Sequence, residues 1–381
     1  MSDCFKKDIL NAAKVMVVGC GALGNEVLKN LALMKVGNIV LVDFDNVETD
    51  NLKRSILFNE FQDSVGLPKV DVVAYVIRKI HPEINLTVIN GDISADVGLG
   101  LIKDMDVVIG CVDNRWARYC INRLCMRVGV PWIDGGISEL EGIVKIFEPG
   151  KNCYACTLSN EEMDNMKRRF SCAGNIRRAL KTESAPTTSL IASIIGSIQV
   201  QEALKLIHNK YNDNPIFETL SGKMLIYDGK YFSFSTVGIS AFDDDCSVHE
   251  YWKPVIKSTI SSKTTIREAL WLTKIQLGAY SVSLNLINDC FVDFICDKET
   301  DEKFSVMLPG RFVENFINQS PELSKKPISS YYQNEIRKFH RDSPYLDMTL
   351  EEIGIPEHDI LFMKCGINGI YRERDYFIEI Q

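Results

Sequence analysis

The stretch Val15–Asp43, which reads VMVVGCGALGNEVLKNLALMKVGNIVLVD, decides the fold. A short apolar run ends in the spacing Gly-x-Gly-x-x-Gly (Gly19, Gly21, Gly24), an amphipathic segment follows, and a second apolar run ends at Asp43. This order predicts strand, glycine turn, helix and strand, with an acid about twenty residues past the glycines. The glycines let the backbone approach a phosphate, and the helix N-terminus offers unpaired N–H groups. The stretch therefore predicts a nucleotide-binding βαβ unit.

Strand and helix patterns alternate through the first part of the chain. We expect strands near 15–19, 38–43, 86–90, 107–111 and 131–134, and helices near 22–36, 69–81 and 114–129. Further on, we expect a strand at 141–148, an irregular crossing segment at 151–186, a long helix at 187–208 and strands at 223–228 and 231–236. Such alternation predicts an α/β fold with a doubly wound, Rossmann-like and mostly parallel sheet, interrupted by a cysteine-bearing crossover loop.

The composition changes near residue 240, where the acidic run Asp243–Asp245 begins. We expect a nucleotide-binding domain over residues 1–240, a linker over 241–261 and a small α+β domain over 262–381. A helix at Thr265–Leu277 opens that last domain. β-rich runs follow it at 281–288, 290–296, 303–308, 359–364 and 375–380.

Length and composition limit the classes of function. Of the 381 residues, 46% are hydrophobic and 25% are charged, which is ordinary for a soluble globular protein. The net charge of −8 is unfavourable for general nucleic-acid binding. The start, MSDCFKKDIL, is polar, and we expect neither an export signal nor an apolar run of membrane-spanning length, hence no membrane partner. Twelve cysteines without an export signal suggest thiols, metal ligands or catalysis in a reducing, cytoplasmic compartment.

Three further motifs follow Asp43: Asn51-Leu-x-Arg54, Gly-x-Pro-Lys69 and Asp113-Asn114. A dehydrogenase needs none of them, whereas nucleotidyl transfer needs cations around the phosphates and a carboxylate for Mg²⁺. The simpler alternatives are that the two cations are surface charges and that the acid caps a helix. Together, and in this order, the motifs favour an ATP site.

These motifs resemble those of the ubiquitin-activating and ThiF/MoeB adenylating family, and within it those of the catalytic subunit of NEDD-type modifier-activating enzymes. The resemblance covers nearly the whole chain. It implies that Asp43 holds the ribose hydroxyls, that Asn51, Arg54 and Lys69 surround the triphosphate of ATP, and that Asp113, followed by Asn114, coordinates Mg²⁺.

The sequence departs from that family at its beginning. Many members carry an arginine-rich segment before the first strand, which reaches the ATP of a partner subunit. Here Lys6 and Lys7 are the basic residues before the first strand, and no arginine precedes Arg54. Either another subunit supplies the arginine or the site works without it. Because the family pairs two such folds, we expect a homodimer or a heterodimer with a related subunit.

Cys153-x-x-Cys156 has metal-ligand spacing, and Cys246-x-x-His249 is the obvious second pair. Three cysteines and one histidine form a legitimate structural zinc site, so we expect Zn²⁺ here. The alternative is two unrelated loop pairs. In the resembled family a second Cys-x-x-Cys occupies the later position, so His249 is a departure that zinc chemistry permits.

Cys172 lies in the crossing segment, within FSCAGNIRRAL. Four arginines flank it, and cations lower the pKa of a thiol. The resembled family keeps its thioester-forming cysteine in such a crossover, so Cys172 is the candidate catalytic nucleophile. The alternative is an inert buried cysteine.

The run LDMTLEEIGIPEHDILFMK and the later YFIEI resemble the closing strands of the ubiquitin-fold domain that docks the conjugating enzyme; a dimerisation or lid domain is the alternative. The full expectation is a modifier-activating enzyme: it adenylates the glycine-ended tail of a ubiquitin-like modifier, forms a thioester on Cys172 and transfers it to a conjugating enzyme. Two rivals stay open. One is MoeB/ThiF-like adenylation of a sulfur-carrier protein without conjugation, and the other is a silent partner subunit.

Overall fold

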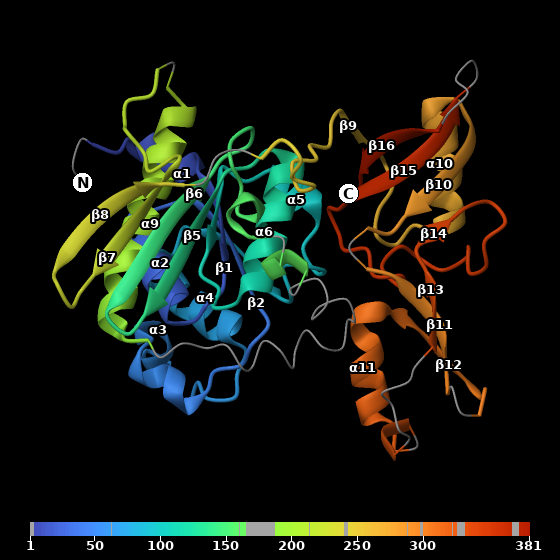
Figure 1. Ribbon diagram of the computed structural model, residues 1–381, viewed down its shortest axis with the longest axis horizontal. Helices are drawn as coiled ribbons and strands as arrows, with labels where there is room; N and C mark the ends of the chain where they lie inside the picture. The colour runs from blue at the N-terminus through green and yellow to red at the C-terminus, as the bar shows by residue number, and fades with distance from the viewer. Residues whose placement is uncertain are drawn as a thin grey trace. The chain divides into compact units, whose positions relative to one another are not determined.

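The computed structural model describes residues 4–61, 63–159, 161–164, 187–212, 214–239, 243–287, 289–297, 300–321, 323–325, 332–367 and 373–381. These residues form two compact units (Figure 1). The first holds the described residues of Met1–Ser94, Ile102–Met163 and Glu183–Tyr251. The second holds Ala95–Leu101, Asp164 and the described residues of Trp252–Gln381.

One eight-stranded sheet runs through the first unit. Its order is β3 (Asn85–Asn90), β2 (Asn38–Asp43), β1 (Lys14–Val18), β4 (Val107–Gly110), β5 (Trp132–Ser138), β6 (Glu141–Phe147), β7 (Lys223–Asp228) and β8 (Ser233–Gly238). Pairing is parallel from β3 to β5 and antiparallel from β5 to β8. The predicted Rossmann-like fold class is thus confirmed. β8 begins two residues later than expected, because Tyr231 and Phe232 belong to the turn before it, where Phe232 has a φ of 51°.

Helices cover both faces of this sheet. They are α1 (Lys7–Ala12), α2 (Ala22–Leu33), α3 (Ile56–Asn59), α4 (Lys69–Ile80), α6 (Arg115–Val128) and α9 (Ser189–Lys210), with 3₁₀ turns at Thr49–Lys53 and Ala155–Thr157. The short helix α5 (Leu99–Lys103) has its first three residues in the second unit. α2 packs against α4 and α9 in one layer, whereas α6 packs on β4 and β5. A right-handed crossover from β4 to β5 runs away from β1 and so puts α6 on the opposite face.

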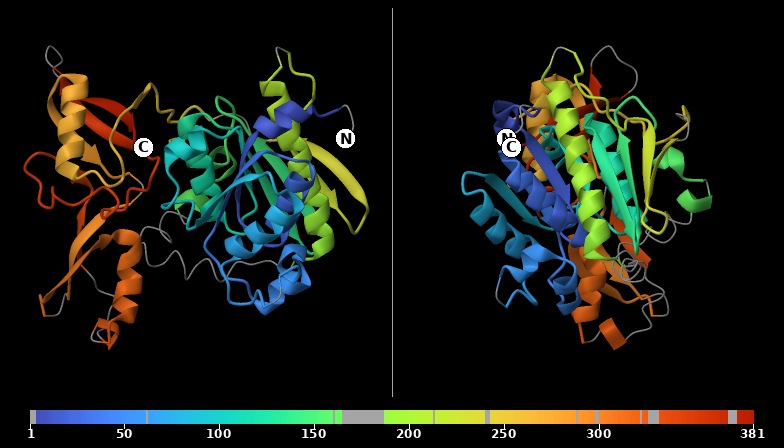
Figure 2. Two further views of the ribbon diagram at one scale, coloured as in Figure 1. Left: turned by 180° about the vertical axis from the view of Figure 1, so that it is seen from behind. Right: turned by 90° about the vertical axis from the view of Figure 1, so that its left-hand side faces the viewer.

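Helix α9, drawn lime green, runs along the sheet in both views of Figure 2. By length and composition alone it could span a membrane, the one such helix among the described residues, so the expectation of no apolar run of that length was wrong. α9 packs on α2, β5 and β6, and its buried Gln199 donates from Nε2 to the Gly110 carbonyl at 3.0 Å. A helix enclosed between a sheet and another helix is apolar on most of its circumference, which explains its composition.

The second unit contains two sheets. A five-stranded sheet has the order β14 (Lys338–Phe339), β10 (Ala279–Asn285), β15 (Ile360–Ile367), β16 (Arg374–Glu379) and β9 (Val255–Lys257), and a three-stranded sheet has the order β12 (Lys303–Pro309), β11 (Phe291–Cys296) and β13 (Tyr332–Ile336). Helix α10 (Ile266–Leu277) packs on β10, and α11 (Gly310–Gln319) packs on β11 and β12; a 3₁₀ turn lies at Leu323–Lys325. Pairing in the larger sheet is antiparallel except for β16 with β9, which is parallel.

The helix expected at Thr265–Leu277 is present as α10. Thr265 is its N-cap and forms a capping box with Glu268, and Gly278 ends it with a φ of 59°. Helix α11 was not expected, although Val313 and Ile317, one turn apart, are both buried. Its apolar residues recur at helical spacing (Phe312, Val313, Phe316 and Ile317), a signal that the sequence analysis did not use.

Residues Ala95–Leu101 precede β4 in the chain but belong to the second unit. The Leu99 N–H donates to Asp359 Oδ1 at 2.9 Å, and the Gly100 N–H donates to the His358 carbonyl at 2.8 Å. A Cβ on Gly100 would lie 2.5 Å from that same carbonyl oxygen, so the approach requires glycine. The second unit is therefore built from three separate stretches of chain, which a simple C-terminal domain over 262–381 did not anticipate.

Candidate functional site

The glycine turn, residues Gly19–Gly24, lies where β1 ends beside β4. The sheet order reverses at β1, because β2 lies on one side and β4 on the other, and such a switch point is where α/β sheets bind ligands. Gly19 has a φ of 97°, and a Cβ on it would lie 2.5 Å from the Cys111 carbonyl oxygen. A Cβ on Gly24 would lie 1.9 Å from the Gly19 oxygen. The turn therefore needs glycine at both positions to pack against β4.

Asn25 holds the glycine turn in place. Its Nδ2 donates to the carbonyls of Cys20 at 2.7 Å and Gly21 at 3.2 Å, and its Oδ1 accepts the Leu57 N–H of α3 at 2.9 Å. Asn25 is fully buried, and its bonds with Cys20 and Leu57 are protected from water. This residue was missed by the motif analysis, although its place directly after Gly24 was a signal. Through it, the turn and the start of α3 are joined.

Asp43, the acid at the end of β2, faces the same turn. Its Oδ2 accepts the Cys20 N–H at 2.6 Å, and its Oδ1 accepts the Asp45 N–H at 2.8 Å. Burial raises the pKa of the Asp43 carboxyl above its ordinary value, against the opposing effect of Lys69 and these two N–H groups. Each oxygen keeps a further lone pair, so Asp43 can still accept hydroxyl groups of a ribose.

Lys69 begins α4 and is brought to the same place. Its Nζ donates to Asp45 Oδ2 at 2.8 Å, and its side chain is 11% exposed. Burial lowers the pKa of Lys69, but the carboxylates of Asp43 and Asp45 outweigh burial, and the net direction is upward. A lysine with a raised pKa stays protonated at neutral pH. The structure thus joins two predicted residues, Asp43 and Lys69, through Asp45, to which the sequence analysis had assigned no role.

Asn51 and Arg54 lie at the 3₁₀ turn that leads into α3. Asn51 is buried and accepts the Glu48 N–H on Oδ1 at 2.9 Å, so its amide nitrogen is the atom that can donate to a phosphate. Arg54 donates from Nη1 to Thr187 Oγ1 at 2.8 Å. Thr187 is the first described residue after the crossing segment, and no sequence motif had identified it.

Asp113 and Asn114 follow β4. The N-cap of α6 is Asn114, whose Oδ1 accepts the Ala117 N–H at 2.8 Å. Asp113 is exposed and receives one long contact of 3.5 Å from Asn114 Nδ2. The alternative that Asp113 caps the helix is therefore wrong, and its carboxylate is available to a hard cation such as Mg²⁺. Asn114, by contrast, already has a structural role.

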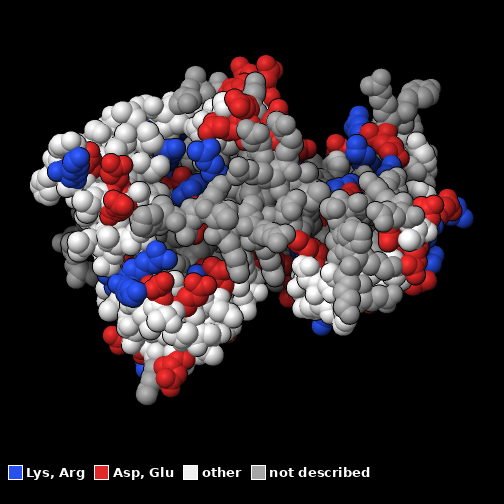
Figure 3. All heavy atoms as spheres, turned by 60° about the horizontal axis from the view of Figure 1, so that its bottom comes forward, with Lys and Arg blue, Asp and Glu red and all other residues white. Residues whose placement is uncertain are grey.

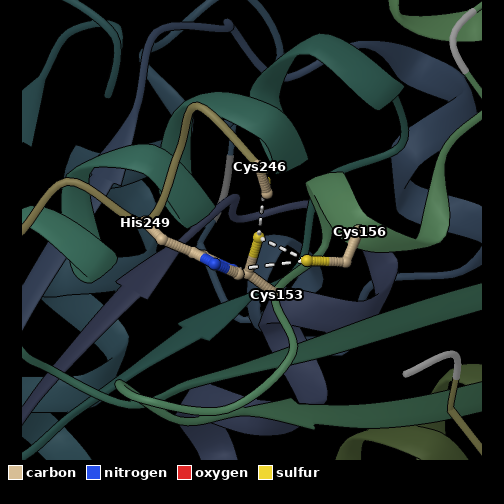
Figure 4. A group of neighbouring side chains, drawn as sticks. All are labelled: Cys153, Cys156, Cys246 and His249. Carbon is tan, nitrogen blue, oxygen red and sulfur yellow. Dashed lines mark hydrogen bonds between the residues drawn. The ribbon is translucent and has the colours of Figure 1, made fainter. Parts of the chain in front are cut away.

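Four predicted metal ligands come together in the first unit (Figure 4). The Sγ atom of Cys153 lies 3.7 Å from that of Cys156 and 3.8 Å from that of Cys246, and Cys156 Sγ lies 3.3 Å from His249 Nε2. The four ligand atoms all lie within 4.8 Å of one another. The two pairs are 93 residues apart in sequence, so this group is not a product of local structure.

This spacing fits zinc. A tetrahedral ion bound about 2.3 Å from sulfur and about 2.0 Å from nitrogen has ligand atoms about 3.8 Å (S–S) and about 3.5 Å (S–N) apart. Burial raises the pKa of the Cys153 thiol to about 12 and also raises that of Cys246. Without a metal, both are uncharged thiols at neutral pH, and a bound cation would convert them to thiolates. The alternative of two unrelated loop pairs is wrong, since the pairs meet.

Two predicted features lie elsewhere. Cys172 and its flanking arginines fall within 165–186, outside the described residues. Lys6 donates its N–H to His208 Nε2 at 2.9 Å and its Nζ to Asn212 Oδ1 at 3.3 Å, both beside the C-terminal end of α9. Lys210 of that same end binds Asp106, which also accepts the Lys14 N–H at the start of β1. Lys6 therefore lies at the end of the sheet opposite the glycine turn of its own chain.

Comparison with known proteins identifies the first unit. The ThiF family matches residues 4–248. The chain is 32% identical over 230 residues to the molybdopterin-synthase adenylyltransferase of Salmonella typhimurium, covering 60% of this chain and 84% of the relative. It is 28% identical over 239 residues to the SAMP-activating enzyme E1 of Haloferax volcanii, covering 63% and 81%. It is 35% identical over 151 residues to SUMO-activating enzyme subunit 2 of Dictyostelium discoideum, covering 39% and 22%.

The fold has solved counterparts as well. The crystal structure of E. coli MccB with ATP matches 64% of this chain and 67% of that chain, with a TM-score of 0.50 and 24% identity, which supports the fold. The family match ends at residue 248, just before the second unit resumes at Trp252. The predicted resemblance to the ThiF/MoeB superfamily is confirmed: the chain belongs to the ThiF family, an adenylyltransferase family, which matches it from residue 4 to residue 248.

Proposed function

We propose that this protein activates a ubiquitin-like modifier at the expense of ATP. The modifier's C-terminal carboxylate attacks the α-phosphorus of ATP, the bond from that phosphorus to the β-phosphate oxygen breaks, and pyrophosphate leaves. An acyl adenylate results. The observation that carries the proposal is the meeting of Asp43, Lys69 and the glycine turn at the switch point of a ThiF-family sheet.

Each residue of this site has a role that its chemistry supports. Asp43 accepts the ribose hydroxyls, while Arg54 and Lys69 offset the charge of the triphosphate and of the departing pyrophosphate. Asn51 donates from its amide nitrogen. Asp113 would hold Mg²⁺, which supplies charge neutralisation on the phosphates when bound.

The second chemical step belongs to Cys172. Its thiolate attacks the acyl carbon of the adenylate, the bond to the AMP oxygen breaks, and a thioester forms as AMP leaves. The flanking arginines Arg168, Arg169, Arg177 and Arg178 favour the thiolate. The step requires residues 151–186 to bring the Cys172 thiolate to the adenylate.

The second unit is proposed to dock a conjugating enzyme, which takes the modifier from Cys172 onto its own cysteine. Supporting this, α10 packs on a mixed sheet in which β15 and β16 pair, as expected for a ubiquitin-like fold. Figure 3 shows basic and acidic side chains in small interspersed groups on the described part of one face, in keeping with protein partners and a net charge of −8. We propose a cytoplasmic location and a dimer, following the sequence analysis.

The test is a two-stage assay with full-length protein, Mg·ATP and a candidate modifier that ends in glycine. We expect modifier-dependent ATP–pyrophosphate exchange and an adduct that thiols cleave. Cys172→Ala should keep the exchange and lose the adduct, whereas Cys4→Ala, at an exposed cysteine of the same chain, should keep both. An adduct that survives in Cys172→Ala and maps to another cysteine would contradict the assignment.

A second candidate function is adenylation of a sulfur-carrier protein without conjugation. It is favoured by the match to the molybdopterin-synthase adenylyltransferases, which extends over 84% of the Salmonella relative. The two functions differ in one measurable step. Activation for conjugation predicts transfer of the thioester to the cysteine of a conjugating enzyme, whereas sulfur-carrier activation predicts exchange with no such transfer.

A further inference from the structure

We infer that Thr187 is a positioning residue for ATP binding, which acts by holding the guanidinium of Arg54 toward the triphosphate. This inference rests on the proposed function, because it assumes that Arg54 meets phosphate. The contact is direct: Arg54 Nη1 lies 2.8 Å from Thr187 Oγ1, across 133 residues of sequence. A guanidinium only donates hydrogen bonds, so the threonine oxygen is the acceptor.

The partner of Arg54 is neutral, whereas Arg118 and Lys69 of the same unit bind carboxylates. Arg118 donates to the carboxylate of Asp134 at 2.8 Å and to two backbone carbonyls. Lys69 pairs with Asp45. Among the residues that the structure describes, no carboxylate lies within ion-pair distance of Arg54. The positive charge of Arg54 is therefore held in place without being neutralised.

The guanidinium also has unused donor capacity. Arg54 Nε is buried and has no hydrogen-bond partner in the described part of the chain. The nearby acid Asp50 is bound to Lys53 at 2.7 Å instead. Because a buried donor without a partner is costly, such a group indicates a missing acceptor. A phosphate oxygen, with its full negative charge, would satisfy both the charge and the donor.

Both ends of the contact are fixed to the scaffold around the glycine turn. Arg54 directly precedes Ser55, the N-cap of α3, and α3 is tied to the turn by the bond from Leu57 N to Asn25 Oδ1. Thr187 directly precedes Thr188, which is the N-cap of α9. The Thr188 hydroxyl also donates to the Glu139 carbonyl at 3.3 Å. A long arginine side chain has many rotamers, and a fixed acceptor selects one of them before the ligand arrives.

The inference predicts the effect of three substitutions on the binding of Mg·ATP alone, measured by titration calorimetry on the full chain. Thr187→Val keeps the side-chain shape and removes the acceptor, so the Kd should rise about three- to tenfold, the range of one typical intramolecular hydrogen bond. Thr187→Ser keeps the hydroxyl and should bind like the unaltered protein. In an Arg54→Ala background, Thr187→Val should have no further effect, since it acts through Arg54.

The neighbouring threonine gives the matched control. Thr188→Val removes the α9 cap and should lower the melting temperature while leaving the Kd for Mg·ATP unchanged. If Thr187→Val also leaves the Kd unchanged, or if its effect persists in Arg54→Ala, the inference is wrong while the proposed function stands. If the unaltered protein does not bind Mg·ATP at all, the proposed function itself fails. These two results cannot be confused.

Discussion

Removing one ligand of the cysteine–histidine group should destabilise the first unit by a predictable amount. The group joins Cys153 and Cys156 to Cys246 and His249, 93 residues later. The ligand atoms already have tetrahedral spacing, so metal binding needs no rearrangement and closes a loop of that length. By the chain-entropy relation for a cross-link, a 93-residue loop is worth about 4–5 kcal/mol. In a unit of this size, that corresponds to about 10–15 °C in melting temperature.

The perturbation is Cys246→Ser, and the control is Cys4→Ser, at an exposed cysteine outside the group. Elemental analysis should find about one zinc per chain in the unaltered protein and in the control, and much less in Cys246→Ser. Scanning calorimetry should show the lower melting temperature in Cys246→Ser, and a strong chelator should lower that of the unaltered protein by a similar amount.

Two results would refute this reasoning. A metal-free protein that melts normally would mean that the four side chains meet without binding zinc. A Cys246→Ser variant that keeps its zinc and its melting temperature would mean that Cys246 is not a ligand. A loss of zinc with an unchanged melting temperature would leave the ligand assignment intact but contradict the stabilisation calculated from loop closure.

The remaining predictions concern the nucleotide site and pH. Asp113→Ala should abolish modifier-dependent ATP–pyrophosphate exchange, because Mg²⁺ would lose its protein carboxylate. The control Asp8→Ala, at an exposed acid of α1, should keep the exchange. Equal exchange rates in the two variants would contradict the assignment of Asp113. Gly21→Ala should keep the melting temperature, since its Cβ meets nothing within 4 Å, but it should weaken Mg·ATP binding. Gly24→Ala should lower the melting temperature and also weaken Mg·ATP binding, because its Cβ would lie 1.9 Å from the Gly19 oxygen. Unchanged Mg·ATP binding in Gly21→Ala would show that phosphate does not approach the turn there. Zinc affinity, measured by competition with a chromogenic chelator, should fall as the pH falls. Burial raises the pKa of Cys153 to about 12 and raises that of Cys246, so at least two protons leave on binding, and affinity should drop about a hundredfold per pH unit; a flat profile would show that thiolates are not the ligands.

The sequence by itself determined the local elements of the first unit. Apolar runs such as Val15–Val18 and Ile39–Val42 are buried on both faces and form parallel strands, because continuous apolar runs avoid water only inside a covered sheet. The glycine spacing fixed the turn after β1, since only glycine fits at Gly19 and Gly24. The alternation of these elements then determined the sheet and the edge at which a nucleotide site would form.

Only the tertiary structure decided which side chains meet. Arg54 and Thr187 are 133 residues apart, and no local pattern determines that contact. The two metal-ligand pairs, 93 residues apart, were predicted to meet because of their ligand spacing, but only the packing of the chain brings the four atoms to tetrahedral distances. That Asn114 rather than Asp113 caps α6 depends on backbone geometry at the end of β4. The inclusion of Ala95–Leu101 in the second unit depends on the close approach of Gly100 to His358. Local sequence sets backbone conformation and burial, whereas contacts between distant residues follow from how the finished elements pack.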